Sequence, residues 1–180
     1  ARKRFNASVD FRSVINDLHR LGIAIQGCFV FGLDHDTPEV FDTTVEFAIE
    51  TGIDLPRYAV LTPFPGTPLH ARLEREGRIL TRDWTLYDAQ HVVFQPRNMS
   101  VRELAEGHER AWKQTYRWSA IGRRLWRAGN LRPLALTANT GYRFYAHNLH
   151  RFYTCDWPID IIDRPQVAPE TASAARVVCG

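Results

Sequence analysis

Side chains that could hold a metal ion gather toward the C-terminus of the chain. His147, His150 and Cys155 lie close together, and Asp156 follows Cys155 directly. Zinc sites in proteins use four such ligands at tighter, paired spacing. We therefore favour scattered polar residues on a helix and its exit loop over a zinc site, and we predict no metal ligand in this chain.

Other side chains could transfer protons. His35 lies between two aspartates, which suits acid–base chemistry or a metal ion, since an imidazole titrates near neutral pH. We favour a solvated histidine in a loop ahead of a helix. The hydroxyl groups of Tyr58, Thr62 and Tyr87 could donate hydrogen bonds or protons at the mouth of a barrel, or they could anchor the fold.

Helices and strands that would position these groups alternate along the first part of the chain. Residues 8–21 carry an apolar stripe at helical spacing and end at a glycine. Residues 23–33 form a long apolar run without clean alternation, which predicts a strand buried on both faces, as in a parallel sheet. A second helix is predicted to begin with Asp36 or Thr37 as its cap and to stop near Gly52.

The most distinctive segment is Leu61-Thr62-Pro63-Phe64-Pro65-Gly66-Thr67-Pro68, which follows a predicted strand over 58–61. Three prolines and a glycine hold one rigid path. Taken alone, the segment favours a turn that redirects the chain. A stiff loop after a parallel strand is also where α/β barrels and open sheets bind ligands.

The alternation of helix and strand is typical of a parallel sheet. Two parallel strands do not form a stable sheet alone. We therefore predict that residues 1–68 are the trailing part of a larger barrel or sheet. The alternative is that later residues supply strands, and residues 91–94 are the one good candidate.

The rest of the chain is predicted to be mainly helical, and Ser100 and Glu103 form a capping box. Trp84 and Tyr87 are expected to anchor an irregular stretch. The predicted segments are a helix over 68–76, the irregular stretch over 78–95, a long helix over 101–127, a helix over 133–153 interrupted at Gly141, and a disordered tail from 165 onward.

Charge divides the chain into two parts. Residues 34–109 contain 14 acidic and 7 basic side chains, whereas residues 110–155 contain 9 basic side chains and no acidic one. The 180 residues include no apolar run near the roughly 18 residues that a membrane span needs. Because the only methionine is Met99, we expect the chain to be part of a longer polypeptide. Its three cysteines are widely spaced, which fits a reducing cytoplasm.

Two motifs resemble the radical SAM enzymes, most closely those with an N-terminal cobalamin-binding domain. They are the run Gly27-Cys28-Phe29-Val30-Phe31-Gly32-Leu33-Asp34-His35-Asp36-Thr37 and the proline-rich loop. Downstream matches to the same subgroup are Glu76-Gly77-Arg78-Ile79, Asp83-Trp84, His91-Val92-Val93-Phe94 and Met99-Ser100. Their order and spacing extend the resemblance from about Phe5 to Tyr116.

The resemblance implies an α/β fold, the C-terminal part of a partial (β/α)6 TIM-like barrel followed by a mainly helical extension. The implied units are the last βα units over 1–68, a connecting segment over 69–99, the helical extension over 100–164 and a tail over 165–180. The implied chemistry is reductive cleavage of S-adenosylmethionine, bound with a [4Fe–4S] cluster, to a 5′-deoxyadenosyl radical that abstracts a hydrogen from the substrate. With cobalamin, the expected outcome is methyl transfer or a related modification of an unactivated carbon in a small-molecule or lipid-like substrate.

Site residues follow from the same resemblance. In the family a fifth-strand pattern, glycine-x-isoleucine-x-glycine-x-x-x-glutamate, helps to hold the adenine, and here Cys28 replaces its first glycine. The predicted cofactor-binding residues are Val30, Gly32, Asp36, Thr62 and Pro63. No catalytic residue is assigned. The alternative is a buried strand whose glycines allow helix packing and whose Asp36 caps a helix.

The family's three cluster cysteines, spaced CxxxCxxC, are absent from this sequence. We expect the cluster ligands and the cobalamin domain in an upstream part of the same polypeptide, so this part alone would be inactive. We expect the protein in the cytoplasm, where it can also make peripheral contact with the inner face of the membrane.

Residues 110–132 carry seven basic side chains interleaved with aromatic ones. This pattern suits a non-catalytic module that binds a membrane surface or nucleic acid, and it is our alternative to the enzyme. It also suits a helix whose tryptophans pack while arginine stems cover the edge. We do not expect nucleic acid to be a partner of the enzyme.

Overall fold

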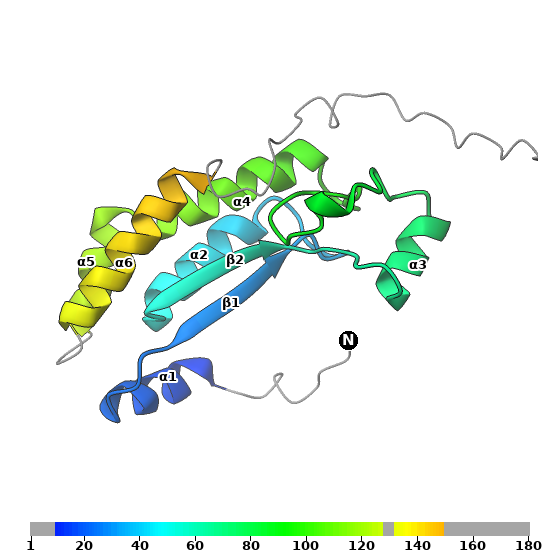
Figure 1. Cartoon of the computed structure of the whole chain (residues 1–180). Helices are drawn as coiled ribbons and strands as arrows, with labels where there is room; N and C mark the ends of the chain where they lie inside the picture. Colours follow the sequence, from blue (N-terminus) through cyan, green and yellow to red (C-terminus); the bar gives the residue numbers. More distant parts are fainter. Residues whose placement is uncertain (1–9, 128–131, 150–180) are drawn as a thin grey trace, which may run out of the picture.

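The computed structural model describes residues 10–127 and 132–149, and helices outnumber strands in it (Figure 1). In chain order the elements are α1 (Phe11–Arg20), β1 (Gln26–Phe31), α2 (Val40–Thr51), β2 (Leu55–Val60), α3 (Pro68–Arg75), the short 3-10 helix η2 (Trp84–Leu86), α4 (Val101–Thr115), α5 (Trp118–Arg127) and α6 (Arg132–His147). The predicted α/β class is confirmed.

The two strands form a parallel pair, in register from Gln26 opposite Leu55 to Phe31 opposite Val60. Helices α2 and α4 both contact this pair. Phe31 and Val60 are buried on the helix side, each about 1% exposed, whereas Val30 is 47% exposed on the other side. The prediction that this strand is buried on both faces is therefore wrong for the described residues, because nothing among them covers the second face.

The outer edge of β2 is sealed by side chains and loop backbone. Tyr116 donates its hydroxyl to the carbonyl of Pro56 at 2.7 Å, and the Nε2 atom of His108 lies 3.2 Å from the carbonyl of Tyr58. The backbone N–H of Val60 donates to the carbonyl of Ala89 at 2.8 Å. These partners occupy the positions that a further strand would need.

The outer edge of β1 is different. The carbonyls of Ile25 and Phe31 accept hydrogen bonds from the β2 side, so alternation directs the backbone groups of Gln26, Cys28 and Val30 away from β2. No strand in the described part of the chain pairs with that edge. The pair therefore has one closed edge and one edge still able to accept a strand.

An aromatic cluster joins α4 to β2 and α6. The ring of Trp112 meets Tyr58 edge-on at 5.6 Å and stacks on Tyr142 at 6.0 Å. Tyr116 also stacks on Tyr142, at 5.4 Å. This cluster is the link between the strand pair and the C-terminal helices.

Gly107 lets α4 approach α2 closely. A Cβ atom added at Gly107 would lie 2.2 Å from the Cε2 atom of Phe41, whose side chain is 1% exposed. No such contact exists at Gly122 of α5 or Gly141 of α6, where an added Cβ meets nothing within 4 Å. Glycine is thus required by packing at only the first of these three helical positions.

We expect Gly107→Ala to destabilise the fold by about 1–3 kcal/mol, because overpacking at Phe41 outweighs the gain in helix propensity. The matched controls Gly122→Ala and Gly141→Ala should stabilise it by up to about 1 kcal/mol. Urea denaturation followed by far-ultraviolet circular dichroism measures all three. A stabilised Gly107→Ala protein would contradict the packing argument.

Several predicted boundaries need correction. The helix expected to begin at Asp36 or Thr37 begins at Val40 instead, and neither residue caps it through its side chain. The helix predicted over 101–127 is broken into α4 and α5, because the carbonyls of Thr115 and Tyr116 accept hydrogen bonds from arginines of α5 and α6. Conversely, α6 continues through Gly141 without interruption.

At the N-terminus, α1 begins after its cap Asp10, and of its expected apolar stripe only Ile15 is buried. Residues 91–94 form no sheet strand; the only bridge there pairs Ile79 with Phe94. The starts predicted for α3 and α4 are confirmed, since Thr67 caps α3 and the capping box of Ser100 and Glu103 caps α4. The tail predicted from 165 onward lies outside the described residues.

Candidate functional site

The carboxyl ends of β1 and β2 lie next to each other. Because the strands are parallel and Phe31 faces Val60, the loops over 32–39 and 61–67 leave the same end of the pair. The structure therefore brings the segments that carry all five predicted cofactor-binding residues to one end of the sheet. This is the end at which α/β folds bind their ligands.

The uncovered face of the strand pair leads to this end. Val30 is half-exposed there, and Cys28 and Arg57, which are paired in register, are exposed on the same face by strand alternation. Cys28 is a free thiol. The face thus offers apolar surface beside one sulfur atom and one guanidinium group.

Asp36 fixes the backbone conformation just after β1. Its Oδ2 atom accepts hydrogen bonds from the backbone N–H groups of Gly32 and Leu33, both at 2.9 Å. The side-chain amide of Asn98 donates to the carbonyl of Asp34 at 2.9 Å and reaches that of Asp36 at 3.4 Å. The carboxylate expected to contact a cofactor or cap a helix therefore serves first to fold the loop around Gly32.

Gly32 has a local explanation. Its φ of 96° lies in the region that favours glycine, and an added Cβ would lie 3.0 Å from Leu104 and 3.1 Å from Phe94. The helix-packing alternative raised for the glycine is thus supported at this position. Close approach of a ligand to the same backbone remains a prediction.

The proline-rich loop turns two of its predicted site residues inward. Thr62 and Pro63 are buried, and the Thr62 hydroxyl donates to the carbonyl of Val60 at 3.1 Å. Phe64 is 50% exposed, and Pro65 and Gly66 after it are also exposed. The surface that this loop offers to a ligand therefore comes from residues that sequence reasoning did not select.

The tyrosine hydroxyls named as proton donors have structural partners. Tyr58 lies 2.6 Å from the hydroxyl of Thr115, and burial raises its pKa to about 12. Tyr87 donates to the carbonyl of Thr81 at 2.8 Å, and burial raises its pKa as well. Both hydroxyls stay neutral at physiological pH and anchor the fold.

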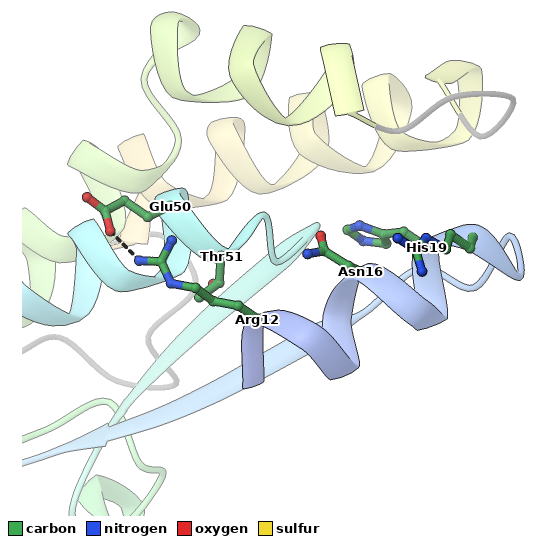
Figure 2. A pocket seen from close by; sticks show the side chains of 6 residues that line it. Arg12, Asn16, His19, Glu50 and Thr51 are labelled. Atoms are coloured by element: carbon green, nitrogen blue, oxygen red, sulfur yellow. Dashed lines mark hydrogen bonds and ion pairs between the residues drawn. The ribbon is translucent and has the colours of Figure 1, made fainter. Parts of the chain in front are cut away.

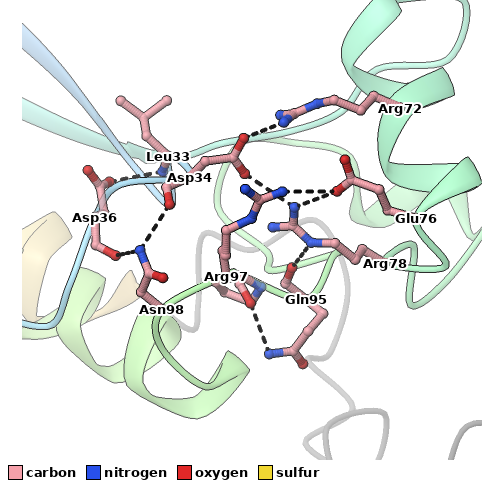
Figure 3. Close-up of polar contacts among 10 residues, drawn as sticks. Leu33, Asp34, Asp36, Arg72, Glu76, Arg78, Gln95, Arg97 and Asn98 are labelled. Carbon is pink, nitrogen blue, oxygen red and sulfur yellow. Dashed lines mark hydrogen bonds and ion pairs between the residues drawn. The ribbon is translucent and has the colours of Figure 1, made fainter.

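An ion-pair network ties the end of β1 to the segments that follow β2 (Figure 3). The carboxylate of Asp34 accepts from Arg72 of α3 and, at 3.2 Å, from Arg78. Arg78 also donates to Glu76 at 2.8 Å and to the carbonyl of Gln95 at 2.8 Å. The hydrogen bond from Arg72, with a further one from Arg78, holds the pKa of the Asp34 carboxyl below its usual value. Sequence reasoning missed this network.

A groove of about 560 Å³ lies along α1 and α2, at the other end of the strands (Figure 2). Its walls are polar, and Arg12 bridges it to Glu50 with a 2.6 Å ion pair. His19 approaches the buried carboxylate of Asp54, which also accepts from the backbone of Ile25. The groove is separate from the carboxyl ends of the strands, and we assign it no chemistry.

Comparison with known proteins identifies the C-terminal part of the chain. Residues 67–164, which begin at the cap of α3, match the family described as "Domain of unknown function (DUF4070)". The chain belongs to this family, the C-terminal domain of cobalamin-binding radical SAM enzymes.

Curated relatives of this radical SAM chain agree with that membership. It is 36% identical over 123 residues to bacteriochlorophyllide d C-12(1)-methyltransferase of Chlorobaculum tepidum, which covers 68% of the chain and 26% of that relative. It is 26% identical over 142 residues to anaerobic magnesium-protoporphyrin IX monomethyl ester cyclase of Cereibacter sphaeroides. This alignment covers 74% of the chain and 23% of that relative. With hopanoid C-2 methylase of Rhodopseudomonas palustris it shares 33% identity over 81 residues. This alignment covers 45% of the chain and 15% of that relative.

The radical SAM chain thus spans about a quarter or less of the length of these relatives. Among its described residues no cluster of histidine, cysteine and carboxylate side chains could hold a metal ion, and His35 is exposed. Of the suggested zinc ligands, His150, Cys155 and Asp156 lie outside the described residues. None of the described helices combines the length and apolar character needed to cross a membrane.

Proposed function

We propose that this chain is the C-terminal part of a cobalamin-dependent radical SAM enzyme that methylates an unactivated carbon on a large apolar ring substrate. The observation that carries the proposal is the 36% identity to a bacteriochlorophyllide methyltransferase over two thirds of the chain. The named substrates of the relatives, a bacteriochlorophyllide, a protoporphyrin ester and a hopanoid, are all large ring systems with mostly hydrocarbon skeletons.

The strand pair supports a barrel in this proposal. β2 is closed along its outer edge by Tyr116, His108 and Ala89, whereas the outer edge of β1 has no partner strand among the described residues. Strands that precede β1 in a barrel would pair with this edge and continue the uncovered face around Val30. In the proposed enzyme, β1 and β2 are thus the last two strands of a partial (β/α)6 barrel.

The residues at the strand ends fit S-adenosylmethionine but not a cluster. Val30 offers an apolar contact on the uncovered face, and Asp36 fixes the backbone beside it. Cys28 is the one cysteine among the described residues, so this part of the chain lacks a thiolate set for [4Fe–4S]. We propose that cluster and cobalamin are held by other parts of the polypeptide. One S-adenosylmethionine, cleaved with an electron from an external reductant, would supply the 5′-deoxyadenosyl radical, and a second would supply the methyl group.

The test uses the complete polypeptide, loaded without oxygen with iron, sulfide and cobalamin. It is given dithionite as the electron donor and S-adenosylmethionine with a deuterated methyl group. A bacteriochlorophyllide and a hopanoid serve as probe substrates. We expect formation of 5′-deoxyadenosine and, by mass spectrometry, transfer of the labelled methyl group to a ring-substrate carbon. A cluster-loaded protein that forms neither product would overturn the proposal.

Val30→Asp tests the site itself. An unpaired charge facing the adenine should weaken S-adenosylmethionine binding at least about fivefold, since a buried unsatisfied polar group costs about 1–3 kcal/mol. Ile23→Asp is the matched control, because Ile23 is also 47% exposed but precedes β1. Equal affinity in the two variants, measured by equilibrium dialysis, would remove Val30 from the site.

A further inference from the structure

Helices α5 and α6 turn large apolar side chains toward solvent. Trp126 is 82% exposed, Leu134 64%, and Trp118 and Phe144 57% each. Trp118 and Trp126 are eight residues apart on α5, and Leu136, 46% exposed, and Phe144 are eight residues apart on α6. Because this spacing is about two helical turns, each helix presents one apolar stripe to solvent.

The inner sides of the same helices are held firmly. Arg124, 2% exposed, donates to the side chain of Asn139 at 3.0 Å and to the carbonyl of Thr115 at 2.9 Å. Asn139 in turn donates to the carbonyl of Asp54 at 3.3 Å. These bonds fix the pair against α4 and β2, so the exposed stripes cannot turn inward to be buried without breaking them.

Charge indicates what covers these stripes. Arg117 and Arg123 are exposed beside the two tryptophans of α5, and Arg143 lies over the ring of Trp118 at 4.8 Å. No acidic residue occurs in 117–127 or 132–149. Basic and aromatic side chains on one surface complement anionic lipid headgroups, where tryptophan rings prefer the interface and arginine binds phosphate.

We propose that α5 and α6 together form a peripheral docking surface for an anionic membrane. The two helices lie on the headgroups, with Trp118, Trp126 and Phe144 at the level of the interface. The proposal rests on the exposed side chains of α5 and α6 and not on the methyl-transfer chemistry. It adds a location, because membrane contact would bring the enzyme to a surface at which the proposed apolar ring substrates accumulate.

The test is co-sedimentation of the complete protein with vesicles, without cofactors or substrate. Vesicles of phosphatidylcholine with an equal amount of phosphatidylglycerol should bind at least about tenfold more protein than pure phosphatidylcholine, and added salt should weaken that binding. The double variant Trp118→Ser with Trp126→Ser should lose at least about tenfold in affinity, because both side chains are removed from the interface.

Trp84→Ser is the matched control, because Trp84 is 53% exposed on η2. Circular dichroism checks that all variants keep the fold, which exposed substitutions should leave intact. Equal vesicle binding by the double variant and the control would overturn the proposal. Failure to bind anionic vesicles, or binding of single-stranded RNA in place of them, would also overturn it. None of these outcomes depends on whether the methyl-transfer reaction is observed.

Discussion

Trp112→Ala is expected to lower the free energy of unfolding by about 3–5 kcal/mol, the range for truncating a large buried aromatic side chain. Trp112 is 1% exposed, and its ring contacts Tyr58 of β2 and both Tyr142 and Tyr145 of α6. Its loss would leave a cavity where the strand pair, α4 and α6 meet. Because small domains are stable by only about 5–15 kcal/mol, much of the fold's stability would go.

Trp126→Ala is the control for this substitution. It removes the same side chain from a position that is 82% exposed, so stability should change by no more than about 0.5 kcal/mol. Urea midpoints by far-ultraviolet circular dichroism distinguish the two, since the loss of one tryptophan does not disturb this signal. A small effect at Trp112, close to that of the control, would contradict the assignment of this ring to the centre of the core.

Acid is expected to destabilise the protein through His108. This imidazole is 1% exposed, and its Nε2 atom lies 3.2 Å from the carbonyl of Tyr58 and 3.1 Å from the indole nitrogen of Trp112. The nitrogen can donate to the carbonyl or accept from the indole, but not both at once. Burial lowers the pKa of His108 to about 4, from 6.5 for an unperturbed histidine.

Between pH 6.5 and 4 the unfolded chain therefore binds a proton at His108 that the folded chain excludes. The contribution to stability is fully present above pH 6.5 and falls by about 3 kcal/mol as the pH drops to 4. We expect His108→Gln to remove this slope, because glutamine keeps an amide near Tyr58 but does not titrate. Urea unfolding at several pH values compares the two proteins. Parallel curves would show that His108 is not the group responsible.

Local signals in the sequence predicted the elements that are fixed locally. The cap at Thr67 and the capping box at Ser100 use side chains that bond to backbone three residues away, so short patterns suffice to find them. Likewise, the left-handed Gly52 ends α2 where a glycine was expected. The order of alternating helices and strands, which is visible as successive short patterns in the sequence, predicted the parallel pair.

Long-range contacts account for what the sequence did not reveal. Residues 115–118 contain neither glycine nor proline, yet α4 ends there because Arg124 and Arg143 satisfy its last carbonyls. Asp34 joins Arg72 and Arg78 across separations of 38 and 44 residues, which no spacing rule covers. Asp36 looked like a helix cap because its neighbours fit that pattern, but its carboxylate turns back to β1.

The candidate site was predictable only in outline. That two strand ends would meet followed from the helix–strand order, and Val30 does lie on the uncovered face. Whether a loop residue points outward depends on contacts that form after folding. Thr62 and Pro63 are buried, and Phe64 between two prolines is exposed instead.

The residues that close the outer edge of β2 follow it in the chain, so this edge is open during part of the protein's synthesis. β2 leaves the ribosome before Ala89, His108 and Tyr116, the residues that close its outer edge. Until Tyr116 emerges, the nascent strand carries unpaired backbone groups that can recruit strands of other chains and aggregate. A translation pause at which β2 has emerged but Tyr116 has not should therefore raise aggregation, whereas a pause after Tyr116 has emerged should not.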